Sequence, residues 1–265
     1  MITWMLGYAV LGAVAGFFAG LLGVGGGAIM VPVLALMFAA QGFPQEHLMH
    51  LALGTSMAAI VFTSISSLRA HHAHGAVRWP IVRLITPGIL LGTFLGAQLA
   101  SLIPTRPLAI FFTLFMSYVA FQMLANIKPK PSRQLPGGIG MFAVGNGIGA
   151  ISALVAIGGG SLSVPFMTWC NVRMHEAIGT SAAIGLPIAV AGTLGYLVGG
   201  WGSTGLPAGS FGYIYLPALA ACVALSMLTA PFGARAAHRL PVATLKKIFA
   251  GVILLLLAKM VHGLF

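Results

Sequence analysis

The sequence contains the same interruption twice. In each copy three consecutive glycines break a long apolar run, and a Val-Pro pair begins four residues after the last glycine; the copies occupy residues 25–32 and 158–165. Two further blocks repeat in the same order, namely Gly-Thr-Ser at 54–56 and 179–181, and Gly-Ala at 96–97 and 233–234. Three matched blocks in one order predict a gene duplication, which constrains the fold more than any other feature.

The segments around these blocks are too apolar for a soluble domain. Hydrophobic residues make up 59% of the chain and charged residues 6%, whereas soluble domains carry about 25% charged residues. We therefore expect an all-α membrane protein. Each half contains about five apolar runs, at about 3–22, 28–40, 48–68, 79–101 and 106–126 in the first half and about 139–156, 161–171, 176–198, 212–234 and 244–262 in the second.

A polar, proline-rich stretch separates the two halves. It begins at Lys128 and includes Lys130 and Arg133. We therefore assign residues 1–127 to a first membrane repeat and residues 139–265 to a second. Residues 128–138 form a cytoplasmic linker between the repeats.

Lysine and arginine gather in some of the gaps between the apolar runs. The basic residues of these gaps are Arg69, Arg78, Arg83, Lys128, Lys130, Arg133, Arg173, Arg235, Arg239, Lys246 and Lys247. Placing them in the cytoplasm leaves Arg106 and Lys259 for the other side and predicts that both termini lie outside the inner membrane. Since the net charge of +11 is spread over these gaps, the expected partner is the lipid bilayer and not nucleic acid.

The charge pattern also predicts how the halves are oriented. The gap at 69–83 is basic, while its counterpart at 199–212 carries no charged residue. The halves therefore enter the membrane from opposite faces, which makes them inverted-topology repeats.

The run after each glycine triplet is short. Residues 28–40 would form about 20 Å of helix, against about 30 Å of hydrocarbon. The first two segments of each half therefore form a hairpin broken by glycine, with a turn that stops inside the membrane and is buried in protein or faces a watery cavity. Glycine suits such a turn because it accepts positive φ and lets a ligand approach the backbone.

The start of each short helix offers a binding site for an anion. Its unpaired N–H groups and positive dipole end favour negative charge, and two inverted copies would aim two such ends at one place. The predicted substrate-binding residues are Gly25, Gly26, Gly27, Ala28, Thr55, Ser56, Gly158, Gly159, Gly160, Ser161, Ser163, Thr180 and Ser181. The alternative interpretation is that these small residues only allow close helix packing.

Two histidines, His50 and His175, precede the Gly-Thr-Ser blocks at matching positions. Histidine changes charge near neutral pH, so these residues are candidates for proton coupling; the alternative places them at the membrane interface as helix-end residues. The two acidic residues, Glu46 and Glu176, fall in gaps or at helix ends. The sequence therefore indicates no proton relay or sodium site built on a buried carboxylate.

A family resemblance is carried by residues 16–27, Pro32, the block at 54–56 and their second-half copies. The chain resembles the TauE/SafE family of sulfite and organosulfur-anion exporters over nearly its whole length. The resemblance implies an inner-membrane transporter for a small sulfur-containing anion, such as sulfite, sulfoacetate or a related sulfonate. One departure is Ala156-Ile157 in place of Gly23-Val24, which indicates a less open second turn.

The expected function is secondary transport of such an anion by alternating access, in the direction of export. The alternative is an anion channel, or a membrane module that does not cycle and serves sulfur metabolism. We expect no enzyme, because no Ser-His-Asp, HExxH or paired-acid constellation is present. We expect no cofactor and no metal site, since Cys170 and Cys222 lack metal-ligand spacing. Assembly into a homo-oligomer stays open.

Overall fold

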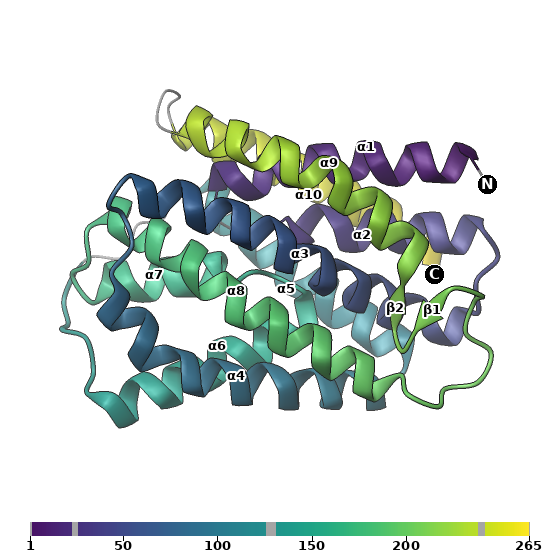
Figure 1. Ribbon diagram of the computed structural model, residues 1–265, viewed down its shortest axis with the longest axis horizontal. Helices are drawn as coiled ribbons and strands as arrows, with labels where there is room; N and C mark the ends of the chain where they lie inside the picture. Colours follow the sequence, from purple (N-terminus) through teal and green to yellow (C-terminus); the bar gives the residue numbers. More distant parts are fainter. Residues whose placement is uncertain (1, 23–25, 126–130, 238–241, 265) are drawn as a thin grey trace.

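The computed structural model describes residues 2–22, 26–125, 131–237 and 242–264. Within these ranges the chain forms ten α-helices, a 3₁₀ turn and one short β-hairpin (Figure 1). The helices are α1 (Ile2–Leu22), α2 (Gly27–Ala40), α3 (Leu48–Ala73), α4 (Trp79–Leu102), α5 (Thr105–Leu124), α6 (Gly138–Val155), α7 (Gly160–Trp169), α8 (Met174–Gly199), α9 (Leu216–Ala237) and α10 (Val242–Leu264). The turn η1 is Gln45–His47, and strands β1 (Ser210–Phe211) and β2 (Ile214–Tyr215) pair antiparallel. The predicted all-α class is confirmed.

Seven helices in the described residues are long and apolar enough to cross a bilayer, namely α1, α3, α4, α5, α6, α8 and α9. The predicted run at 212–234 was wrong at its start, because the chain forms the β-hairpin up to Tyr215 before α9 begins. Gly212 has a φ of 55° in the tight turn between the strands, a conformation that glycine adopts readily and that two-residue hairpin turns require.

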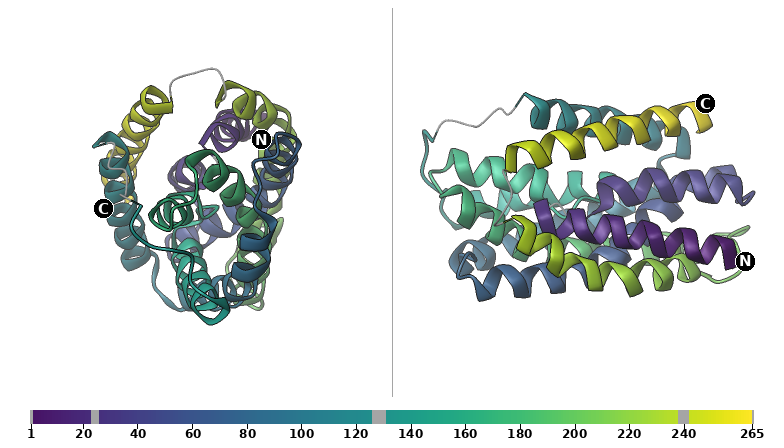
Figure 2. Two further views of the ribbon diagram at one scale, coloured as in Figure 1. Left: turned by 90° about the vertical axis from the view of Figure 1, so that its left-hand side faces the viewer. Right: turned by 90° about the horizontal axis from the view of Figure 1, so that it is seen from above.

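Helices α3 and α8 pack against each other within the bundle. Figure 2 shows this bundle end-on and from above. Of the residues in the most apolar 18-residue stretch of each span, 83% are buried in the span that contains α3, against 33% in α1. The side chains of Thr55, Ser56, Thr63 and Ser64 are all buried on α3. The central helix of the bundle is therefore also one of its more polar ones.

Helices from different halves form the closest pairs. Helix α1 lies along α9, and α4 lies along α6 (Figure 1). Glycines make these approaches possible, since a Cβ on Gly16 would lie 2.5 Å from the carbonyl oxygen of Ser226, and one on Gly149 would lie 2.6 Å from that of Ile89. Close backbone approach through small residues is a common way for helices to associate in lipid.

The two halves also exchange matching hydrogen bonds. Oγ1 of Thr55 in α3 accepts a bond of 2.9 Å from the backbone N–H of Tyr215, directly before α9. Oγ1 of Thr180 in α8 accepts a bond of 3.0 Å from the backbone N–H of Arg78, directly before α4. Thr55 and Thr180 hold the same position in the repeated Gly-Thr-Ser blocks, so each half anchors the start of a helix that belongs to the other.

The ends of the bundle differ in composition. Both marked chain ends and the β-hairpin lie at one end, whereas the α3–α4 and α7–α8 connections lie at the other (Figure 1). At this second end Arg173 forms an ion pair with Glu176 at 2.5 Å, and the backbone N–H of Arg133 donates to the carbonyl oxygen of Trp169 at 3.2 Å. These contacts of basic residues thus lie on the side away from the chain ends.

Candidate functional site

Two glycines start the two short helices in the same way. Gly26 is the N-cap of α2 with a φ of 78°, and Gly159 is the N-cap of α7 with a φ of 81°. Both angles are left-handed, a region that side chains other than glycine disfavour. Gly25, which we predict to bind substrate, lies outside the described residues. The duplicated glycine triplets therefore form equivalent helix starts where they are described.

The short helices begin half-way along the central pair. Helix α2 has 14 residues and α7 has 10, or about 21 Å and 15 Å of helix, less than the roughly 30 Å that a full crossing needs. A Cβ on Gly27 would lie 3.1 Å from the side chain of Ile60, in the middle of α3, and one on Gly185, in the middle of α8, would lie 3.0 Å from the carbonyl oxygen of Gly158. Each glycine break is therefore at mid-depth of the bundle.

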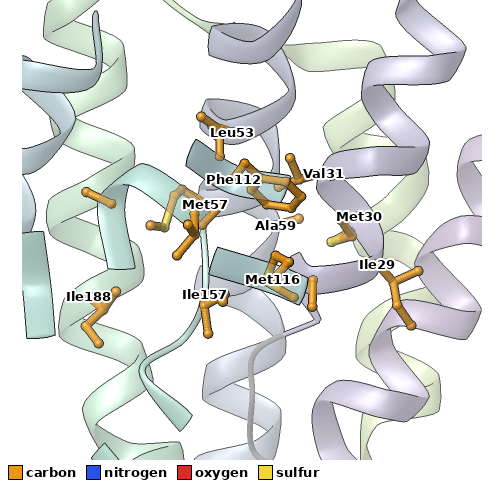
Figure 3. Packing of buried hydrophobic residues seen from close by; sticks show 14 of the residues in the cluster. Ile29, Met30, Val31, Leu53, Met57, Ala59, Phe112, Met116, Ile157 and Ile188 are labelled. Carbon is orange, nitrogen blue, oxygen red and sulfur yellow. The ribbon is translucent and has the colours of Figure 1, made fainter. Parts of the chain in front are cut away.

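The two breaks touch each other. A Cβ on Gly27 would overlap the carbonyl oxygen of Ala156, which ends α6 with a φ of 45°. Ala156 and its neighbour Ile157 are buried. Figure 3 shows Ile157 below Met57 of α3 and near the level of Met116 of α5, and all three belong to one cluster of buried apolar side chains. Backbone from both halves therefore meets in the core, in a dense apolar surrounding.

Both helix starts lack a capping side chain for their first N–H groups. The carbonyl oxygen of Gly26 accepts from the N–H groups of Ile29 and Met30, each at 3.1 Å, and that of Gly159 accepts from Ser163 at 2.7 Å. Neither glycine has a side chain that could cap the first N–H groups of its helix. Those groups belong to Gly27 and Ala28 in α2 and to Gly160 and Ser161 in α7, and all four residues are buried. Buried, uncapped helix starts are suited to an anion.

Four predicted serines are buried, and two of them, Ser161 and Ser163, lie in the first turn of α7. Oγ of Ser163 donates to Oγ of Ser181 at 2.8 Å, and both side chains are fully buried. The hydroxyl groups of Ser161 and of Ser56, on α3, are buried and have no hydrogen-bond partner within the described part of the chain. A buried hydroxyl without a partner is unfavourable, so these two groups are available to a polar ligand.

The threonines of the repeated blocks serve another contact. Thr55 precedes Ile60 by five residues on α3, and Thr180 precedes Gly185 by five residues on α8. Each threonine is therefore about 7.5 Å along its helix from the level of the breaks, and the two are displaced toward opposite ends of the bundle. Their oxygens accept from the backbone N–H groups of Tyr215 and Arg78. The structure therefore places these two predicted residues at the joints between the halves, apart from the glycine breaks.

The comparisons with known proteins identify the family. The family model described as "Sulfite exporter TauE/SafE" matches residues 8–260. The chain belongs to the TauE/SafE family.

Several relatives of this TauE/SafE chain carry the same general description. A "Probable membrane transporter protein" from Haemophilus influenzae is 39% identical, over 94% of this chain and 95% of its own. Another from Xylella fastidiosa is 33% identical, over 70% of this chain and 69% of its own, and YdhB from Bacillus subtilis is 27% identical, over 70% and 76%. No solved structure gives a significant match. The chain is therefore a multi-pass membrane protein of a transporter family, and the predicted resemblance is confirmed.

The two candidate coupling histidines of this TauE/SafE protein occupy different surroundings. His50 is buried, and its Nε2 lies 3.0 Å from the carbonyl oxygen of Ile103 and 3.2 Å from that of Ala100. Because carbonyl oxygens only accept, Nε2 carries the proton. The ring also stacks on Tyr213, at 4.9 Å between centroids. His175, at the matching position, is exposed.

The two acidic residues of this family member lie near opposite ends of the bundle. The side chain of Glu46 is 73% exposed. Glu176 pairs with Arg173, and its second oxygen lies 3.8 Å from Nε of Arg78. Among the described residues there is no group of three His, Cys, Asp or Glu that could hold a metal ion.

Sequence reasoning missed one polar feature of this TauE/SafE fold. A small cavity with a volume of about 10 Å³ lies between α1, α3 and α8. This is about the space of one water molecule. Its lining consists of Ala19, Thr63, Ser64, Ser67, Gly158, Ala182 and Gly185. The signal was the hydroxyl-rich run at residues 63–67, which has no hydroxyl-rich counterpart in the second half and therefore did not stand out as part of the duplication.

Proposed function

We propose that this TauE/SafE protein is a secondary transporter that exports a small sulfur-containing anion, such as sulfite, sulfoacetate or a related sulfonate, across the inner membrane. Transport occurs by alternating access between two inverted halves. The observation that carries this proposal is that both glycine-capped helix starts lie at mid-depth, with Gly27 at the start of α2 packed against Ala156, which ends α6 just before the second glycine triplet. The family description adds the sulfur anion and the direction.

The chemistry of the helix starts supports an anionic substrate. N–H groups at the start of a helix, together with the positive end of its dipole, bind anions without a charged side chain. Half-helices that end near mid-membrane are a recurring way for secondary transporters to build a substrate site. The unbonded hydroxyl groups of Ser56 and Ser161 supply additional donors for the oxygens of a sulfite or sulfonate group.

Matching contacts support the inverted arrangement of the halves. In the bond from Tyr215 to Thr55 the second half donates and the first half accepts. In the bond from Arg78 to Thr180 the first half donates and the second accepts, at the matching positions of the two repeats. The same exchange relates the packing of α1 on α9 to that of α6 on α4. A twofold relation of this kind gives two alternative arrangements of similar energy, which alternating access requires.

Charge placement supports the orientation and the direction of transport. The basic connections lie at the end of the bundle opposite to the marked chain ends (Figure 1). By the positive-inside rule this end faces the cytoplasm, and both termini face outward. A basic cytoplasmic surface raises the local concentration of an anion that is to be exported.

The test is anion flux in vesicles reconstituted with the purified protein. Radiolabelled sulfite uptake should saturate with concentration and respond to an imposed pH gradient. Ser161→Ala should reduce uptake, whereas Ser226→Ala should not, because the hydroxyl of Ser226 donates within its own helix to Val223. Flux that never saturates and ignores the gradient would overturn the transporter and favour a channel.

A further inference from the structure

One face of α3 connects the glycine breaks to the basic end of the bundle. Ile60, Ser64, Ser67 and His71 are spaced by four, three and four residues, so they share one side of the helix. Ile60 lies against Gly27 at the breaks, and His71 lies in the last turn of α3. All four side chains are buried, with at most 4% exposed. A buried polar row therefore runs from mid-depth to the end that carries the basic connections.

The cavity lies on this row. Thr63, Ser64 and Ser67 line it from α3, facing Gly158 and Gly185. The hydroxyl of Thr63 bonds to its own helix, at 3.2 Å from the carbonyl oxygen of Ile60. Ser67 is only 4% exposed, and its buried hydroxyl has no hydrogen-bond partner in the described ranges. Because burial of such a group costs free energy unless a polar partner is supplied, a polar occupant of the cavity would supply the partner that the Ser67 hydroxyl lacks.

The other half has no such row. The positions of α8 that match Ile60, Ser64, Ser67 and His71 are Gly185, Ala189, Gly192 and Tyr196.

This side is closed by apolar packing. A Cβ on Gly192 would lie 3.0 Å from Sδ of Met57. The hydroxyl of Tyr196 donates a hydrogen bond of 2.9 Å to the carbonyl oxygen of Ala153. The polar row exists only on the side that leads to the basic end. Its presence is therefore not a by-product of the duplication.

We propose that Thr63, Ser64 and Ser67 form a second anion-binding site, an inner station between the cytoplasm and the glycine breaks. The ligand is a small oxyanion that accepts hydrogen bonds from the hydroxyl groups. Neutral donors bind an anion weakly enough to release it to the next site, as conduction through several sites requires. The cavity holds about one water molecule, so binding of an oxyanion requires a wider cavity than the one in this structure. This inference rests on the proposed function.

The test uses single-cysteine labelling and does not depend on transport. Ser67→Cys should react with the anionic reagent MTSES at least about tenfold faster than Ser226→Cys, since reactivity follows access to the thiol. It should also prefer MTSES over the cationic reagent MTSET, after both rates are normalised to the exposed control Thr204→Cys. The native cysteines, Cys170 and Cys222, are buried, and both are replaced by alanine in each variant.

The outcomes separate the two proposals. If Ser67→Cys labels no faster than Ser226→Cys in folded protein, or prefers the cationic reagent, the inner station is wrong. Ser67→Ala should lower saturable sulfite flux about tenfold, the effect of losing one hydrogen bond to a charged ligand; unchanged flux would overturn the inner station while the proposed function stands. Selective labelling without saturable flux in the wild type would overturn the proposed function and retain the anion site.

Discussion

Gly27 packs so closely on the carbonyl oxygen of Ala156 that a Cβ at position 27 would overlap it. The two residues belong to different halves, and the contact joins the start of α2 to the end of α6. Both atoms are backbone or directly attached to it, so no side-chain rotation can relieve an overlap. This contact fixes the two glycine breaks relative to each other.

Gly27→Ala should therefore destabilise the protein strongly. Forcing a methyl group into a packed core costs about 1–3 kcal/mol, and more where backbone must shift. We expect a lower thermal unfolding midpoint in detergent. Gly147→Ala is the matched control, because a Cβ on this exposed glycine of α6 would meet no atom within 4 Å. Equal midpoints for both variants would show that the two breaks are not in contact.

The geometry also decides which substitutions can probe the breaks. Gly26 and Gly159 have left-handed φ angles, and a Cβ on Gly26 would lie 2.8 Å from the carbonyl oxygen of Ala15. Leucine at either position would strain the backbone as well as fill the site. Ser161→Ala, which removes an unbonded hydroxyl, separates binding from folding more cleanly.

The joints between the halves should respond equally to mutation. Thr55→Val and Thr180→Val each remove the acceptor of one backbone N–H, that of Tyr215 and that of Arg78 respectively. Each change should cost about 1 kcal/mol, the usual net value of one hydrogen bond. Because the two sites share no residue, the double variant should show the sum. Chemical unfolding in detergent measures this; a large effect at one site and none at the other would contradict the equivalence of the joints.

The orientation predicts which positions can be labelled from outside the cell. Thr204 and Gln134 are both exposed, in the connections before α9 and α6 respectively. Thr204→Cys should react with a membrane-impermeant maleimide in intact cells, and Gln134→Cys should react only after permeabilisation. The reverse pattern would show that the basic end faces outward.

The native thiols should give little background in this experiment. Burial raises the pKa of the Cys170 thiol above its usual range, although the nearby Arg133 opposes the shift. A raised pKa lowers the thiolate fraction at neutral pH, and the thiolate is the reacting form. Labelling of wild-type protein at Cys170 should therefore be slow near pH 7 and become faster as the pH rises.

Removal of the two carboxylates should leave transport intact. Glu46 is largely exposed, and Glu176 pairs with Arg173 at the basic end; neither contacts the glycine breaks in the described structure. Glu46→Gln and Glu176→Gln should keep the saturable sulfite flux and its response to a pH gradient, with small changes in thermal stability because exposed ion pairs contribute little. Loss of the pH response in either variant would assign proton coupling to that carboxylate.

Local sequence signals predicted much of the fold, because apolar runs and glycine triplets act on the backbone next to them and both recur in the two halves. Apolar runs of sufficient length predict helices that span a bilayer, and the Gly triplets predict the left-handed helix starts at Gly26 and Gly159. The shortness of the runs after them predicts that α2 and α7 do not cross fully. The hairpin before α9 was missed because its apolar strands resemble the start of an apolar helix.

The duplication predicted equivalent positions and could not predict equivalent surroundings. His50 is buried against Ile103 and Tyr213, while His175 at the matching position is exposed. Ser67 has an unbonded, buried hydroxyl at a cavity, while its counterpart Gly192 is covered by Met57. Matching positions of the two halves therefore differ in the side chains that surround them.

The sequence by itself determined the class of protein, the repeated blocks, the helix breaks and the segregation of basic residues, because each depends on composition or on residues close together in the chain. Only the tertiary structure decided that the breaks meet, that Thr55 and Thr180 join the halves, and that hydroxyl groups of α3 line a cavity. These contacts join residues more than 40 positions apart, and they depend on how small side chains let backbones approach in three dimensions. No local pattern encodes that approach.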